Sequence, residues 1–211
     1  ERRVRSYLPN YWAALWVHEV LHSMGISLHA PGNGFQTGVG QNQASRSWVL
    51  TAWETFKLGW YEDTQVFCAP KDKVRDLIVK LRPIELKGLG HKVAIIPLNS
   101  TQALVVESRR PVGYSEAWPK SNSGIYVYRL DTTLDNDRTN ESTGRDSGND
   151  PSYQKWGYYL ASDQRLNLPI RPHPDSYLDY IIYKGESVTY DGVRITLLES
   201  DEVDVIKISR T

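Results

Sequence analysis

The sequence of 211 residues contains a single cysteine, Cys68, and a single methionine, Met24. One cysteine excludes an internal disulfide, so Cys68 is either a buried thiol or paired with another chain. No apolar run approaches the roughly 20 residues that a membrane-spanning helix needs, and we expect no membrane span. Acidic and basic residues balance at 25 each. We therefore expect no nucleic-acid partner, since such proteins carry a basic surface.

The most informative stretch is the H-E-x-x-H sequence His18-Glu19-Val20-Leu21-His22. Residues four apart lie on one face of a helix, so both imidazoles can bind one Zn²⁺. The glutamate then lies beside a water molecule that the metal activates, placed to take its proton. The alternative is an ordinary amphipathic helix. The apolar segment 11–17 favours the metal site, because polar residues of a buried helix need partners.

The third zinc ligand has two candidates. Gly25 can end the helix in a sharp turn that returns the chain toward the metal. In the metzincin pattern a histidine follows this glycine by three residues, where Leu28 stands here, and His29 is one position later. The alternative is Glu54, because a carboxylate from a second helix completes the His₂Glu set of other zincins. The scarcity of histidine in the chain favours His29.

Two regions differ in the period of their apolar residues. Residues 1–65 contain the predicted helices, about 11–25 and from a cap at Ser45 or Ser47 to Leu58. From residue 66 the period is two, which predicts strands in an antiparallel sandwich, with Asp191-Gly192 as a tight hairpin turn. We therefore expect domains at 1–65 and 66–211, the second with a long polar loop at 132–164. The predicted strands are 74–82, 91–98, 102–108, 124–131, 178–183, 193–198 and 202–209.

A calcium site is a second candidate for metal binding. Asp135, Asp137 and Asp146 follow the spacing of an EF-hand loop, and we consider them as Ca²⁺ ligands. Asn140 replaces the required glycine, and no predicted helices flank the loop. A solvated loop is therefore the favoured interpretation.

Four blocks of the sequence resemble the immune-inhibitor-A-like secreted zinc metallopeptidases. The resemblance implies a secreted or extracellular endopeptidase that acts on protein or peptide substrates. It also implies that His18 and His22 bind zinc and that Glu19 is the general base. The expected fold class is α+β, with the C-terminal helical part of a zincin catalytic domain, incomplete at its N-terminal side, followed by an antiparallel β-sandwich. The blocks are His18–Gly25, Ala52–Trp60, Leu104–Arg110 and Gly185–Thr196.

An upstream polypeptide is also expected. Only seventeen residues precede His18, too few for the sheet that normally comes before such a helix, and the chain begins at Glu1 without an initiator methionine. We expect an upstream segment of the same precursor, or another subunit, to complete the catalytic domain. Trp12 and Trp16 are the expected apolar contacts with it.

Two other functional classes compete with a peptidase. The first is a non-catalytic structural or adhesive extracellular module that retains a zincin core. The presence of Glu19 disfavours it, because a structural zinc site does not need that carboxylate. The second is a glycan-binding sandwich, suggested by seven Trp and thirteen Tyr. Aromatic residues more often serve packing, and no repeated aromatic platform is visible.

Overall fold

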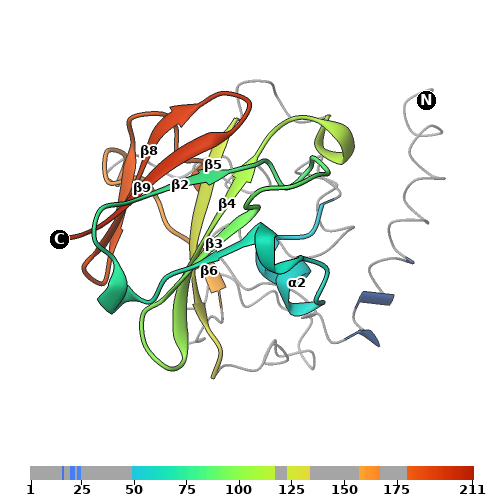
Figure 1. Cartoon of the computed structure of the whole chain (residues 1–211), viewed down its shortest axis with the longest axis horizontal. Helices are drawn as coiled ribbons and strands as arrows, with labels where there is room; N and C mark the ends of the chain where they lie inside the picture. Colours follow the sequence, from blue (N-terminus) through green and yellow to red (C-terminus); the bar gives the residue numbers. More distant parts are fainter. Residues whose placement is uncertain are drawn as a thin grey trace, which may run out of the picture.

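The computed structural model of the chain describes residues 16, 20, 21, 23, 24, 49–116, 123–133, 157–166 and 180–211. Their main body is a two-layer β-sandwich with one short helix, α2 (Ala52–Lys57), beside it (Figure 1). No helix in these ranges is both long and apolar enough to cross a membrane.

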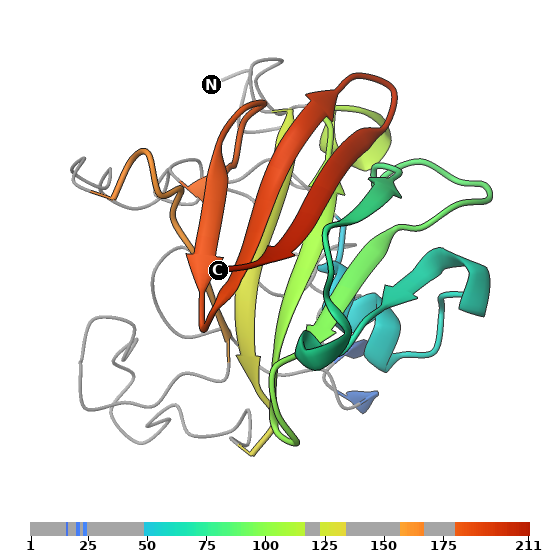
Figure 2. The same cartoon turned by 60° about the vertical axis from the view of Figure 1, so that its left-hand side comes forward.

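The described residues contain nine strands, which form two sheets. The first sheet has the order β1-β3-β4-β5-β6 and the second has the order β2-β9-β8-β7. All pairs are antiparallel except β1 with β3, which is parallel. Figure 2 shows strands of the second sheet in front of β4 and β5. The strands are β1 (Val66–Cys68), β2 (Leu77–Leu81), β3 (Val93–Pro97), β4 (Gln102–Arg109), β5 (Gly124–Asp131), β6 (Gly157–Tyr159), β7 (Ser187–Tyr190), β8 (Val193–Ser200) and β9 (Asp204–Arg210).

The first sheet is buried on both faces, which explains the nearly continuous apolar sequences of its central strands. In β4, Leu104 and Val106 pack between the sheets, whereas Ala103 and Val105 point to the opposite face. On that opposite face, Ala52 of α2 joins the same apolar cluster as Val105. The helix and the first sheet therefore share a hydrophobic core.

The second sheet is buried mainly on one face. In β8, Val193, Ile195 and Leu197 are buried, while Arg194 is exposed between them. This alternation is typical of a strand with one solvated face. The turn before β8 has positive φ at Asp191 (48°) and Gly192 (71°), as a type I′ hairpin turn requires. The predicted Asp191-Gly192 hairpin is thereby confirmed.

The predicted fold class is wrong. Of the described residues 41% are in strands and 15% are helical, so this part of the chain is mostly β with two sheets. It is not a helical zincin part followed by a separate sandwich. The predicted second helix is much shorter, because Thr51 caps it in place of Ser45 or Ser47. The sandwich is also not purely antiparallel, since β1 pairs with β3 in parallel.

Most of the predicted strands are confirmed, with shorter bounds at some ends. The exception is 178–183, where the described residues form only an isolated bridge between Ile182 and Ile125. Three strands were not predicted. Each has three or four residues, too few for a visible period, and they are β1, β6 and β7.

The connection between β2 and β3 closes around a buried lysine. The Lys92 ammonium donates to the carbonyl oxygens of Pro83 (2.9 Å) and Leu86, and the residue is 2% exposed. Burial, and next the positive charge of Arg82, lower the pKa of Lys92 from 10.5 to about 8, against the opposite effect of Glu85.

The stability of the protein is therefore expected to rise between pH 8 and 10. In this window the unfolded chain keeps the Lys92 proton that the folded chain has lost, so the free energy of unfolding increases with pH. The slope is up to about 1.4 kcal/mol per pH unit. Above pH 10 the raised pKa values of Tyr61 and Tyr128 act in the opposite direction. Urea unfolding from pH 7.5 to 9.5 measures the slope, and an equal slope in Lys92→Met would contradict this assignment.

Candidate functional site

Most residues of the predicted metal sites lie outside the described part of the chain. Glu54 is the one predicted ligand that the structure describes. No group of three or more His, Cys, Asp or Glu within the described ranges could hold a metal ion. The residues outside them are His18, Glu19, His22 and His29 of the zinc site, and Asp135, Asp137 and Asp146 of the calcium site.

A residue within the H-E-x-x-H sequence contacts the region of α2. Leu21 is in a helical conformation, is only 3% exposed, and packs with Leu50 and Leu58. Leu50 precedes α2 by two residues, and Leu58 is its C-cap. Leu21, the fourth residue of this sequence, thus packs next to α2.

Another side of the same segment is exposed and apolar. Trp16 is 71% exposed, and Val20 and Met24 are both about half exposed. Their spacing of four residues places them on one face of a helix. This stripe includes Trp16, which the sequence predicts to contact an upstream polypeptide.

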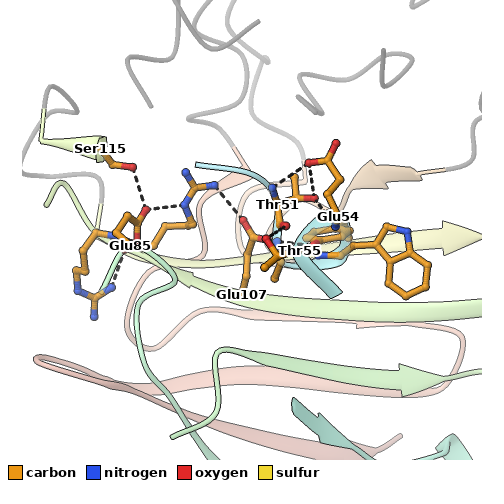
Figure 3. Close-up of polar contacts among 11 residues, drawn as sticks. Thr51, Glu54, Thr55, Glu85, Glu107 and Ser115 are labelled. Atoms are coloured by element: carbon orange, nitrogen blue, oxygen red, sulfur yellow. Dashed lines mark hydrogen bonds and ion pairs between the residues drawn. The ribbon is translucent and has the colours of Figure 1, made fainter. Parts of the chain in front are cut away.

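Glu54 belongs to the capping box that starts α2. Its Oε2 atom accepts hydrogen bonds from the backbone N–H (3.0 Å) and the hydroxyl (2.9 Å) of Thr51. In return, the Thr51 hydroxyl oxygen accepts from the N–H of Glu54 at 3.2 Å. Glu54 is 1% exposed, and Figure 3 shows its carboxylate directed away from Glu107. Helix capping therefore accounts for the Oε2 atom of Glu54. His29, which lies outside the described residues, stays the predicted third zinc ligand.

His29→Ala is therefore expected to weaken zinc binding far more than Glu54→Gln does. A histidine ligand supplies a metal bond, whereas the Glu54 carboxylate serves the backbone and hydroxyl of Thr51. Glutamine keeps an oxygen that can accept the backbone hydrogen bond, so the helix start is preserved. Equilibrium dialysis of both variants against a zinc buffer makes the comparison. The reverse order of affinities would make Glu54 the ligand.

Side chains of the first sheet bind the other free N–H groups at the start of α2. The Oε2 atom of Glu107, on β4, accepts from the Ala52 N–H at 2.6 Å. The hydroxyl oxygen of Tyr128, on β5, accepts from the Trp53 N–H at 3.1 Å and donates to Glu107 at 3.0 Å. With Thr51 as cap, each of the first three helical N–H groups has an acceptor, which is the requirement for burying a helix start.

Glu107 is part of a buried group of charges. Arg109 donates to Glu107 at 3.0 Å and to Glu85 at 2.7 Å (Figure 3), and all three side chains are at most 5% exposed. Burial alone would lower the pKa of Arg109, but the two carboxylates hold it above its ordinary value. Ser115 donates a further hydrogen bond to Glu85.

The carboxylate of Glu107 also affects nearby tyrosines. Burial, and next the negative charge of Glu107, raise the pKa of both Tyr128 and Tyr61. Both phenols therefore stay protonated to a higher pH than an ordinary tyrosine. Tyr128 can then donate its hydroxyl hydrogen to Glu107 while its oxygen accepts from α2.

The sequence of β4 indicates that this strand contains buried charges. Glu107 and Arg109 interrupt the otherwise apolar run of β4, and in a strand buried on both faces such charges need partners. The pattern thus predicts a buried ion pair. It does not predict that the partners include Glu85, twenty-two residues earlier, or the backbone of α2.

Comparison of the chain with protein families, curated proteins and solved structures found no match.

Proposed function

We propose that the protein is a secreted zinc-dependent endopeptidase. The observation that carries this proposal is the H-E-x-x-H sequence His18–His22, followed by Gly25. The resemblance of four blocks to immune-inhibitor-A-like metallopeptidases supports it. Within this sequence, Leu21 is buried against Leu50 and Leu58, and this contact is consistent with a helix that packs on the rest of the protein.

The donor set fits zinc. Two imidazoles from His18 and His22, with a third from His29, are the nitrogen ligands that Zn²⁺ prefers in catalytic sites. When bound, Zn²⁺ lowers the pKa of water and polarises the scissile carbonyl. The Glu19 carboxylate accepts the proton of the attacking water and then delivers it to the leaving amine. Protein or peptide chains are the substrates.

The exposed stripe of Trp16, Val20 and Met24 is where an additional polypeptide would pack. An apolar face of this kind is costly to leave in water. We propose that it is covered by an upstream segment of the same precursor or by another subunit.

Metal content and casein cleavage test the proposed function together. The protein is expected to bind zinc and to cleave casein, and His22→Ala is expected to lose both. His91→Ala is the matched control, because His91 lies outside the motif, where its ring contacts Phe67. The proposal would be contradicted if the wild-type protein bound no zinc, or if His22→Ala cleaved casein as well as the wild type does.

The same experiment separates the alternative, a non-catalytic structural or adhesive module. Such a module would bind zinc without cleaving casein, whereas a glycan-binding sandwich would do neither and would bind sugars on a glycan array. Glu19 favours the peptidase, since a structural zinc site needs no general base.

A further inference from the structure

Helix α2 is fixed to the first sheet by Glu107 and Tyr128. Glu107 accepts from Ala52 and Tyr128 accepts from Trp53, so two strands hold the first turn of the helix. Neither bond is part of the strand pairing, because β4 and β5 pair along their full length through their backbones. Glu107 is completely buried, and Arg109 neutralises its charge at 3.0 Å. These side chains thus bind the start of α2 to the first sheet.

The residues that flank α2 contact the H-E-x-x-H sequence. Leu50 and Leu58 lie on either side of the helix in sequence, and both pack with Leu21. A displacement of α2 on the sheet would therefore move the surface against which Leu21 packs. Helix α2 thus links the two residues: Glu107 binds its first turn, and Leu21 packs against the residues that flank it.

We propose that Glu107 is a positioning residue for the metal-binding sequence: by holding α2, it fixes the surface against which Leu21 of that sequence packs. This inference rests on the proposed function.

Glu107→Gln is the most direct test. Glutamine has the same shape but only one accepting oxygen, so it cannot accept from both Arg109 and Ala52 as the carboxylate does. Amide hydrogen exchange at Ala52 and Trp53 is expected to accelerate about tenfold. The zinc dissociation constant is expected to increase about tenfold, at the lower end of the effect of residues that orient metal ligands.

Asp204→Asn is the matched control. Asp204 is also completely buried and also pairs with an arginine, Arg110, at 2.6 Å. It lies at the start of β9 in the second sheet and makes no hydrogen bond to α2 among the contacts of the described residues. Its replacement is expected to destabilise the fold while leaving zinc affinity and the exchange of Ala52 unchanged.

Two further variants extend the test. The first applies even if Glu107→Gln does not fold, and the second shows which contact transmits the effect of Glu107. Tyr128→Phe removes only the hydroxyl that accepts from Trp53, and is expected to raise the zinc dissociation constant about threefold. Leu50→Ala loosens the contact with Leu21. If the effect of Glu107 passes through this contact, Glu107→Gln will weaken zinc binding less in the Leu50→Ala background than in the wild type.

The outcomes distinguish this inference from the proposed function. Equal zinc affinities of the wild type, Glu107→Gln and Tyr128→Phe would overturn the inference alone. Equal weakening by Glu107→Gln and Asp204→Asn would also overturn it, because the effect would then follow from stability. A wild-type protein that binds no zinc would overturn the proposed function and this inference together.

Discussion

Glu19→Gln is expected to abolish peptide hydrolysis while zinc remains bound. A general base contributes about 10²- to 10⁴-fold to a hydrolytic rate, and the loss of water activation adds to this, so kcat should fall by roughly three or more orders of magnitude. Glutamine preserves the size of the side chain but cannot accept the proton. The two imidazoles of His18 and His22 are unchanged, so the zinc content should equal that of the wild type.

The measurement is casein cleavage by the purified variant, with its zinc content determined on the same sample. Glu202→Gln is a suitable control, because Glu202 is exposed in the turn between β8 and β9. This control should retain full activity. Full proteolysis by pure Glu19→Gln would show that the glutamate is not the base, and loss of zinc would show that it supports the ligands.

The strands of the sandwich could be predicted because their sequences reflect burial directly. In β8, buried and exposed residues alternate from Val193 to Leu197, and Asp191-Gly192 has the residues that a type I′ turn requires. In β4 and β5 the long apolar runs indicate strands covered on both faces. Such local patterns do not specify which strands become neighbours. The pairing of β2 with β9 joins residues more than 120 positions apart and depends on the complete fold.

The start of α2 could have been predicted, and the fold class could not. Thr51-x-x-Glu54 is a capping-box sequence, so the correct helix start was visible in the chain. The predicted fold class followed from the resemblance and from the H-E-x-x-H motif, which favour a helical first part. The local sequence of α2 does not predict which residues of the sheet bind it. That attachment depends on Glu107 and Tyr128, which are far from α2 in sequence.

Arg109→Ala is expected to be the most destabilising substitution among the charged residues described. It would leave two buried carboxylates, Glu85 and Glu107, without the cation that now lies within 3.0 Å of both. Removing one partner of a buried ion pair typically costs about 3–5 kcal/mol, because the remaining charge stays in an environment that cannot solvate it. Urea unfolding at pH 7 measures the loss, and Lys207→Ala is the control. Lys207 pairs with Asp76 at the surface, where loss of an ion pair costs about 0–1 kcal/mol.

A double-mutant comparison distinguishes charge burial from the loss of packing around Arg109. If unpaired carboxylates cause the loss, Glu107→Gln should cost less in the Arg109→Ala background than in the wild type, because it then removes an uncompensated charge. The two substitutions touch the same ion pair, so their free energies of unfolding should not add. Additive losses would show that Arg109 acts by packing and that its charge is not required beside Glu107.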